Sequence, residues 1–310
     1  MSAARILLLR GGLSAEREVS LTSAAEVERA LLGAGYEVTS LDPGWDVAET
    51  LPRALEGVDV VFNALHGKWG EDGNIQALLN FARVPYTHSG VMASSLAMDK
   101  PRSKLLFAAA GIPIVHDRPV TLAELRTGSD PLPRPYVIKP SHEGSSVGVK
   151  IVMPGSGPTD LSGLETYDSL MVEDYVPGRE LTVSVLQARG QAPRALAVTE
   201  LETDAAFYDY EAKYSAEAQT RHIVNPDSLP GDVQEALLRW SEAAHETLGC
   251  RGATRADFRY DPDSGRIAIL EVNTQPGLTP LSLLPEQALA TGMDFTTLVT
   301  WMVENAACDA

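Results

Sequence analysis

Apolar segments alternate with stretches of mixed polarity along the N-terminal third of the chain. Short apolar runs predict buried strands, and the longer amphipathic stretches between them predict helices. Strands are expected at 5–9, 37–41 and 58–65, and helices between 18 and about 33 and at 74–83. Strands that alternate with helices in this way predict a parallel α/β layer.

Two loops of this expected layer are rich in glycine and charged residues. Residues 11–18 follow the first strand, and residues 66–73 follow the third. Ligands of parallel sheets bind beyond the carboxyl ends of the strands. Both loops are therefore candidates for a ligand site.

The middle of the chain predicts a small antiparallel lobe, because several short apolar runs follow one another without long helices. Its strands are expected at 136–139, 149–152, 170–176 and 181–187. Before them, Asp99 is expected to cap a helix that Gly111 and Pro113 end.

Two segments of the last third differ in pattern. Residues 232–248 predict a helix, with Asp232 and Glu235 as a capping box. Residues 203–222 mix aromatic and charged side chains without a clear period. We interpret them as a long functional loop that forms an active-site lid.

A β-hairpin is expected at 255–277, where two apolar runs flank a turn at 261–265. Residues two apart on a strand share a face, so Glu271 and Asn273 point the same way. Their oxygens therefore present two donors on one face of the hairpin.

The opposite strand of this hairpin carries Arg255 and Asp257 on one face. If the register places Asp257 opposite Glu271 and Asn273, three hard oxygen donors converge, which suits Mg²⁺. The alternative is an ordinary hairpin whose carboxylates face solvent. Unpaired charge inside otherwise apolar runs is costly, which favours the metal site.

The segment that follows Lys139 is a candidate phosphate site. The chain has neither a P-loop nor a Rossmann glycine motif. A loop of small residues, with Ser145 and Ser146, comes shortly after Lys139, and such a loop can cover phosphates with backbone N–H groups beside a strand lysine. Lys100 is a second candidate cation. The alternatives are a plain flexible hairpin and a solvated surface lysine.

The end of the strand at 170–176 is a candidate for nucleoside binding. Backbone groups at a strand end can bind the amino edge of adenine, and a carboxylate such as Glu180 can accept hydrogen bonds from ribose hydroxyls. The alternative for Glu173 and Glu180 is a surface turn around Pro177 and Gly178.

Composition narrows the class of protein. The chain has 310 residues, enough for two or three domains, and a net charge of −17. An acidic surface argues against nucleic acid or a membrane as the main partner. The two cysteines lack metal-like spacing, and the apolar run at 6–9 is too short for a signal peptide or membrane span. A cytoplasmic protein is expected.

Five motifs, in order along the chain, resemble the D-alanine:D-alanine ligases of the ATP-grasp superfamily. They are His66-Gly-x-x-Gly70-Glu71-Asp72-Gly73, Met98-Asp99-Lys100, Lys139-Pro-Ser-x-Glu-Gly144-Ser145-Ser146-x-Gly148, the segment 208–214, and Glu271-x-Asn273-x-x-Pro276-Gly277. Each motif is weak alone, but the ordered set is specific.

This resemblance implies an α/β fold with three domains, and an activity. The domains are an N-terminal parallel α/β domain, a small antiparallel α+β lobe and a C-terminal α+β domain, expected at 1–95, 96–178 and 179–310. ATP would phosphorylate the carboxylate of one D-alanine, and the amine of a second would attack the acyl phosphate. The product, D-alanyl-D-alanine, feeds peptidoglycan synthesis. The resemblance also implies two Mg²⁺ ions, for which Mn²⁺ can substitute, and a homodimer.

The resemblance further implies roles for residues in the matching motifs. The catalytic residues would be Glu16, Ser145, Tyr214, Arg255 and Gly277. ATP would be bound by Lys100, Lys139, Ser146, Glu173, Tyr175, Val176, Glu180 and Lys213, and the loop with Ser145 and Ser146 would close over its phosphates. The metal ions would be bound by Asp257, Glu271 and Asn273. The first D-alanine would contact Glu16 and His66, the second would contact Ser282 and Leu283, and Arg255 with the Gly277 N–H would stabilise the oxyanion.

The second substrate is the point at which relatives differ. In the family, a tyrosine matching Tyr214 accompanies D-alanine, and a phenylalanine accompanies D-lactate. Tyr214 could hydrogen-bond to Ser145 and Glu16, which favours D-alanine here. The alternatives are a D-alanine:D-lactate or D-alanine:D-serine ligase and, from another class, a non-catalytic nucleotide-binding protein. Pro280 and Leu281 depart from the polar residues often found before the second-substrate site.

Overall fold

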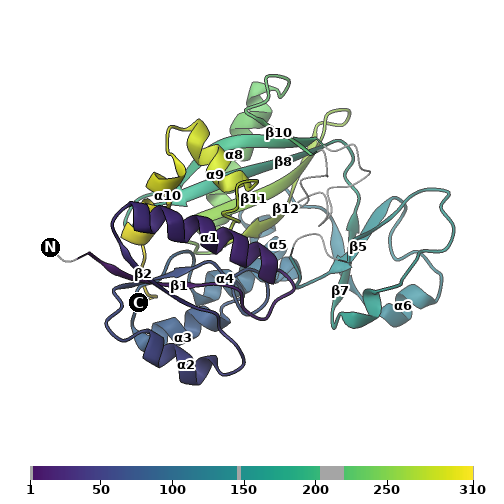
Figure 1. The fold of residues 1–310 in the computed structure, drawn as a ribbon. Coiled ribbons are helices and arrows are strands. Elements are labelled where there is room, and N and C mark those ends of the chain that lie inside the picture. The colour runs from purple at the N-terminus through teal and green to yellow at the C-terminus, as the bar shows by residue number, and fades with distance from the viewer. Residues whose placement is uncertain (1–2, 145–147, 203–219, 310) are drawn as a thin grey trace.

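The structure is a computed structural model and describes residues 3–144, 148–202 and 220–309. Within these residues the strands form three sheets, one parallel and two antiparallel. Figure 1 shows the three sheets as separate regions, with the small one extending to the right. The expected mixed α/β fold is confirmed.

The N-terminal sheet is the predicted parallel layer. Its order is β2-β1-β3, with parallel pairing throughout. Its strands are β1 (Arg5–Leu9), β2 (Glu37–Leu41) and β3 (Val60–Asn63), and its helices are α1 (Arg17–Gly33), α2 (Val47–Ala54) and α3 (Asn74–Ala82). The third strand is shorter than the apolar run at 58–65, because that run extends into the turns on both sides of the pairing.

The second sheet is the small antiparallel lobe, with the order β4-β7-β5-β6. It contains β4 (Asp117–Val120), β5 (Tyr136–Pro140), β6 (Lys150–Val152) and β7 (Leu170–Asp174), with α6 (Leu122–Arg126) and the short helix η1 (Leu164–Thr166). The strand predicted at 181–187 does not belong to this lobe. It is part of a longer strand that pairs with the hairpin in the third sheet.

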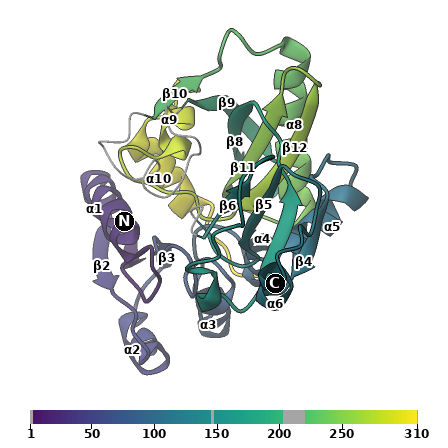
Figure 2. The ribbon, with the colours of Figure 1, turned by 90° about the vertical axis from the view of Figure 1, so that its right-hand side faces the viewer.

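The third sheet has the order β10-β9-β8-β11-β12. Its strands are β8 (Arg179–Gln187), β9 (Arg194–Glu202), β10 (Arg221–Val224), β11 (Gly252–Asp261) and β12 (Arg266–Asn273). The helices around it are α4 (Val91–Met98), α5 (Lys100–Ala109), α8 (Gly231–Thr247), α9 (Leu283–Ala290) and α10 (Phe295–Glu304). Figure 2 shows α8 on one side of this sheet and the pair α9 and α10 on the other.

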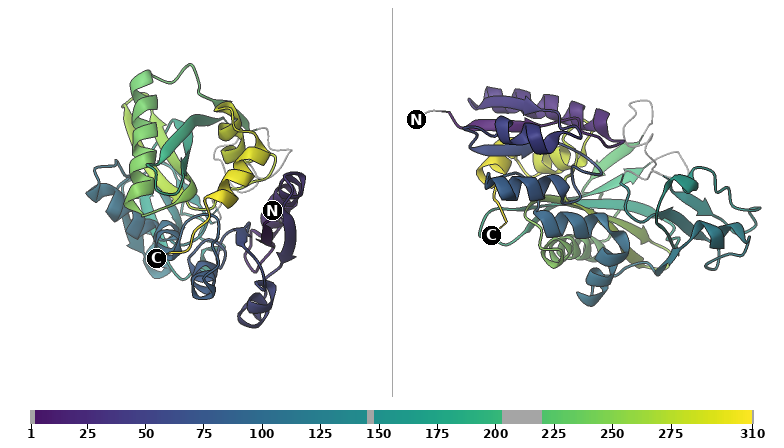
Figure 3. Two further views of the ribbon diagram at one scale, coloured as in Figure 1. Left: turned by 90° about the vertical axis from the view of Figure 1, so that its left-hand side faces the viewer. Right: turned by 90° about the horizontal axis from the view of Figure 1, so that it is seen from below.

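Helices from distant parts of the sequence share these cores. Ala97 and Phe107, on α4 and α5, pack with Leu237 of α8 against the third sheet. On the other face, α1 packs against α10, so the N-terminal layer and the C-terminal helices bury one continuous core (Figure 3). The boundaries of the three domains expected from the sequence stay predictions.

Helix ends were predicted with mixed success. Asp99 caps α5 as expected, because its side chain accepts a hydrogen bond from the backbone N–H of Arg102. The capping box at Asp232 and Glu235 is wrong. Helix α8 begins one residue earlier, at Gly231, and Pro230 precedes it without a side-chain cap. The lid expected at 203–222 falls mostly outside the described residues, and its last two positions belong to β10.

Three buried histidines should make the protein less stable as the pH falls. Burial lowers the pKa of His66 to about 4, of His88 to about 3 and of His245 to about 4. His245 is held as a neutral ring between Thr254 (2.8 Å) and Gln187 (3.0 Å). Below pH 6.5 the unfolded chain binds protons that the folded chain does not. Stability is therefore lost as pH falls from about 6.5 towards 4.

We expect each buried histidine to contribute about 2 kcal/mol to the loss in the free energy of unfolding between pH 7.5 and pH 5. Urea unfolding at the two pH values measures this loss. His245→Gln should reduce the loss, whereas His116→Gln, at an exposed position, should leave it unchanged. An equal pH-dependent loss in His245→Gln and the unmodified chain would contradict this explanation.

Candidate active site

A cleft between the three sheets gathers most of the residues predicted from the sequence. Its walls include Glu16, Lys100, Glu180, Arg255, Asp257, Glu271, Asn273, Gly277, Ser282 and Leu283. An adjoining cavity is lined by Lys139, Glu173, Tyr175 and Val176, and it shares Lys100, Glu180, Asp257 and Glu271 with the cleft. The two spaces therefore meet at the hairpin carboxylates.

The hairpin has the register that the metal hypothesis requires. Asp257 lies opposite Glu271, and Arg255 lies opposite Asn273. Along β11 the residues Ala256, Phe258 and Tyr260 enter the core, so the alternate residues face the cleft. The alternation of polar and apolar residues thus places the charged side chains on the cleft side.

Both carboxylates of the hairpin are neutralised by neighbouring cations. Arg255 holds Asp257 through two parallel hydrogen bonds of 2.8 Å, and Thr182 donates a third, of 2.7 Å. Lys100 lies 3.1 Å from Glu271. These cations offset the repulsion between two carboxylates that lie side by side at the edge of the cleft.

The donor set fits a magnesium ion. Asp257, Glu271 and Asn273 offer only oxygen atoms, the ligand type that Mg²⁺ prefers. The Asn273 side-chain oxygen accepts a hydrogen bond of 2.7 Å from the Gln275 N–H, which fixes its orientation. Among the described residues no three His, Cys, Asp or Glu side chains form a metal-binding group. Asn273 would add a neutral oxygen to the two carboxylates.

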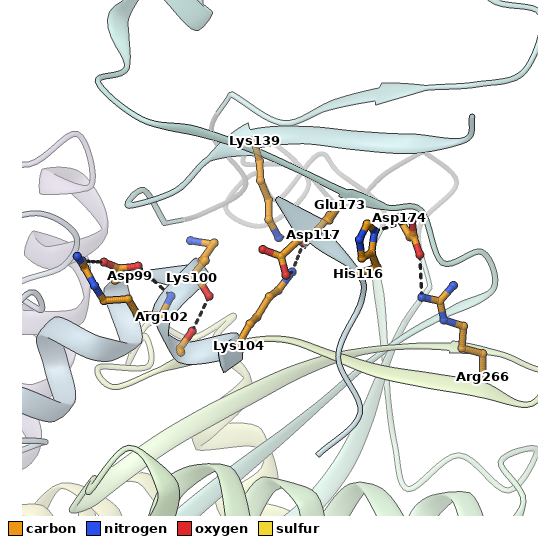
Figure 4. A network of polar contacts seen from close by, with 11 residues as sticks. Asp99, Lys100, Arg102, Lys104, His116, Asp117, Lys139, Glu173, Asp174 and Arg266 are labelled. Carbon is orange, nitrogen blue, oxygen red and sulfur yellow. Dashed lines mark hydrogen bonds and ion pairs between the residues drawn. The ribbon is translucent and has the colours of Figure 1, made fainter. Parts of the chain in front are cut away.

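A buried network of lysines and carboxylates lies behind the phosphate side of the cavity. Lys139 is 2.7 Å from Glu173, and Lys104 contacts the other oxygen of Glu173. Asp117 lies 4.0 Å from Lys104. Figure 4 shows Lys139 and Lys104 reaching Glu173 from opposite sides. Glu173 is therefore the centre of this network. Its carboxylate orients Lys139, the lysine that was predicted to bind phosphate.

The pKa shifts of Lys139 and Glu173 agree with this arrangement. Burial lowers the pKa of Lys139, and the neighbouring lysines add to the effect, although Glu173 opposes it. Burial alone would raise the pKa of Glu173, but Lys139 and Lys104 outweigh it, so the pKa lies below its usual value. Glu173 is thus charged at neutral pH.

Lys104 is a functional candidate that the sequence analysis missed. Its side chain is 1% exposed, which is rare for lysine. It follows Lys100 by one turn of α5, so both lysines lie on one face. That spacing was the available signal, but the partner carboxylate comes from β7, far away in the sequence.

Replacing Lys104 with methionine should destabilise the fold and weaken ATP binding. Removing one partner from a buried ionic network costs about 3–5 kcal/mol. Glu173 would then pull Lys139 away from the phosphates, and we expect ATP affinity to fall by about tenfold, or 1.4 kcal/mol. Lys150→Met, which breaks an exposed pair with Asp160, is the matched control. Urea unfolding and ATP titration that show equal effects for both variants would contradict the assignment.

The nucleoside end of the cavity is shaped by Arg259. Its guanidinium donates to the Val176 carbonyl (3.1 Å) and lies 3.3 Å from Glu180. Arg259 also lies near the Tyr175 ring, at 6.0 Å from its centroid. The strand end and Glu180, both predicted from the sequence, are thus held together by an arginine that the sequence analysis did not select.

Two buried glutamates face the other end of the cleft. Glu16 and Glu71 both line it, and both are buried. Burial, followed by the negative charge of Glu16, raises the pKa of Glu71 well above its usual value. Gly144 approaches so closely that an added Cβ would lie 2.9 Å from a Glu16 oxygen. Two carboxyl groups therefore share one confined space, and an ammonium group bound there would relieve their repulsion.

The wall opposite the hairpin carries the residues predicted for the second substrate. Ser282 precedes α9 and hydrogen-bonds to the Thr279 N–H (2.9 Å), and Leu283 begins the helix. A Cβ at Gly277 would lie 2.7 Å from the Ser282 hydroxyl oxygen, so a larger residue there would displace this hydroxyl. Leu281, one of the two departures from the family pattern, is half exposed and lines the cleft.

Five of the predicted residues are not placed at the cleft: one lies elsewhere, and four are outside the described residues. His66 is buried beside Ser23 (3.3 Å) and lines a neighbouring cavity. Its low pKa makes it neutral at pH 7. The other four, Ser145, Ser146, Lys213 and Tyr214, lie outside the described residues.

Comparisons with known proteins identify the family of this chain. The family profile for the D-ala D-ala ligase C-terminus matches residues 106–304, and that for the N-terminus matches residues 44–89. A D-alanine–D-alanine ligase of Acidiphilium cryptum is 54% identical over 98% of this chain and 99% of its own. That of Granulibacter bethesdensis is 52% identical over the whole length of both chains.

Solved structures give the same result. The D-alanine–D-alanine ligase of Bacillus anthracis complexed with ATP is 30% identical, with a TM-score of 0.78 over 98% of this chain and 97% of the other. The D-alanyl-alanine synthetase A of Vibrio cholerae is 27% identical, with a TM-score of 0.82 over 98% of both chains. With this similarity along nearly its whole length, the chain belongs to the D-alanine–D-alanine ligase family.

Proposed function

We propose that this chain joins two D-alanine molecules in the cleft, driven by ATP, to give D-alanyl-D-alanine for peptidoglycan precursors. One observation carries the proposal. The Arg255–Asp257 pair and the Lys100–Glu271 pair stand side by side at the junction of the two spaces. The glutamate-rich end of the cleft is on one side of this junction, and the nucleoside end is on the other.

The nucleotide would occupy the cavity between the second and third sheets. Glu180 and the backbone at Tyr175 and Val176 would bind adenosine, while Lys139 and Lys100 would bind phosphates. Asp257, Glu271 and Asn273 would hold Mg²⁺, which neutralises phosphate charge when bound. Glu173, which also lines this cavity, and Lys104 would keep Lys139 oriented.

The chemistry requires two transfers. A carboxylate oxygen of the first D-alanine attacks the γ-phosphorus, the bond to the bridging oxygen breaks, and ADP leaves. The amine of the second D-alanine then attacks the carbonyl carbon of the acyl phosphate, loses a proton, and phosphate leaves. Arg255 and the Gly277 N–H stabilise the tetrahedral oxyanion that forms when the amine attacks and collapses when phosphate leaves. Glu16 holds the ammonium group of the first D-alanine.

Measuring ADP release with chosen amino acids tests the proposal. We expect release with D-alanine and formation of D-alanyl-D-alanine, with little release for L-alanine. A mixture of D-alanine and D-lactate tests the choice of second substrate, and the dipeptide should dominate. Predominant D-alanyl-D-lactate, or ADP release that ignores D-alanine, would overturn the proposed specificity.

Two other expectations remain predictions. Within the described residues no helix is long and apolar enough to cross a membrane. The cytoplasmic location, and the homodimer that the family resemblance implies, stay predictions.

A further inference from the structure

A second cavity lies in the N-terminal layer, on the far side of the loops that form the glutamate-rich end of the cleft. It has a volume of about 360 Å³ and opens at the carboxyl ends of β1, β2 and β3. Its walls include Gly12, Trp45, His66, Trp69 and Leu78. In parallel sheets this is the usual position of a ligand site.

Two tryptophans form the mouth of this cavity. Trp45 is 77% exposed and Trp69 is 37% exposed. Their rings meet edge to face, with centroids 5.5 Å apart. Exposed indoles contribute little to the protein core, so a pair of them at a cavity is typical of a surface that binds a ligand.

The backbone holds Trp69 in an unusual conformation. Its φ is 73°, in the left-handed region that large side chains rarely adopt. The Asp72 side chain accepts a hydrogen bond of 2.8 Å from the Trp69 N–H and stabilises this turn. Such conformations cost about 1–3 kcal/mol and cluster at binding sites. The loop is thus built to present the indole at the cavity.

Lys68 supplies positive charge at the mouth. It is exposed, and its ammonium lies 5.6 Å from the centroid of the Trp69 ring. Of the carboxylates nearby, Asp42 is paired with Arg17, Asp72 accepts hydrogen bonds from Trp69 and Asn74, and Asp46 precedes α2. A planar ring between the indoles could therefore place a negative group beside Lys68.

The cavity and the cleft are formed by neighbouring residues of one loop. His66, Lys68, Trp69 and Gly70 line the cavity, and Glu71, the next residue, lines the cleft. A Cβ at Gly67 would lie 3.4 Å from a Glu16 oxygen. The Ser14 hydroxyl also donates to the His66 carbonyl (2.6 Å) and connects the two loops. A ligand that fixes one face of these loops must affect the other.

We propose that this cavity binds a small planar aromatic anion, and that its occupancy changes the affinity of the cleft for D-alanine. The second part rests on the proposed function, whereas the first does not. The probe 8-anilinonaphthalene-1-sulfonate has the required chemistry, and its fluorescence reports binding without any catalysis.

Fluorescence titration of the full chain, in the presence of saturating ATP, should show one saturable probe site. We expect Trp45→Ala to weaken it by about tenfold, and Trp69→Gly, which suits the left-handed backbone, to do the same. Lys68→Gln should weaken the sulfonate probe more than the neutral N-phenyl-1-naphthylamine. Phe81→Ala removes another exposed aromatic ring, on α3, and should leave binding unchanged.

Several results would overturn the site. These are probe binding that ATP displaces, binding that survives both tryptophan changes, or the absence of saturable binding. If the unmodified chain binds no probe and Trp45→Ala reduces self-association, then the indoles contact a second copy of the chain instead. For the coupling, a saturating probe should shift the KM for D-alanine by about fivefold or more, with kcat little changed. An unchanged KM in an active enzyme overturns the coupling alone.

Discussion

Replacing Glu271 with glutamine is expected to abolish turnover at ordinary magnesium concentrations. The carboxylate lies opposite Asp257 and 3.1 Å from Lys100, so it joins the metal side of the site to the phosphate side. An amide keeps the shape but loses the charge. Metal ions supply several kcal/mol of charge stabilisation in phosphoryl transfer, so we expect kcat to fall by about a thousandfold or more.

Rescue by excess metal provides a second measurement on the Glu271→Gln variant. If the lost group is a metal ligand, excess Mg²⁺ or Mn²⁺ should restore part of the activity. Asp263→Asn, in the exposed turn of the same hairpin, is the matched control and should behave like the unmodified chain. Nearly normal activity of Glu271→Gln at low magnesium would remove Glu271 from the metal site.

Changing Arg255 to lysine should reduce kcat by about a hundredfold to a thousandfold while ATP binding survives. Removing one oxyanion donor costs about 3–4 kcal/mol. Arg255 holds Asp257 with two hydrogen bonds of 2.8 Å, a fork geometry that lysine cannot reproduce. The variant therefore loses both the oriented donor and part of the support for Asp257.

Separate measurements of ATP affinity and kcat distinguish these roles. Arg118→Lys, which alters an exposed pair with Glu124, controls for the substitution itself. If Arg255→Lys lowers ATP affinity and leaves kcat intact at saturation, then Arg255 is a nucleotide-binding residue and the oxyanion role fails.

The sequence pattern was sufficient for the hairpin and the parallel layer. Alternation along β11 and β12 put Asp257 and Glu271 on one face, and the register then brought them together. Local periodicity carries this information because each strand presents every second residue to the same side. The resemblance to a known family located the remaining residues of the cleft, including Glu16 and Gly277.

Features that depend on distant contacts were not predicted. Strand 181–187 was assigned to the middle lobe because it follows that lobe in sequence, yet it pairs with β11. Lys104 is informative only once β7 places Glu173 beside it. The two tryptophans meet only because separate loops end at one edge of the sheet. Tertiary packing, which has no local signature, decides all three.

Isotope transfer tests the central claim most directly. D-alanine labelled with ¹⁸O in both carboxylate oxygens should give one labelled oxygen in each phosphate released, and the other should remain in the new peptide bond. This follows because the attacking oxygen leaves with phosphorus when the amine displaces phosphate. Dipeptide formation with unlabelled phosphate would contradict the acyl-phosphate route through this cleft.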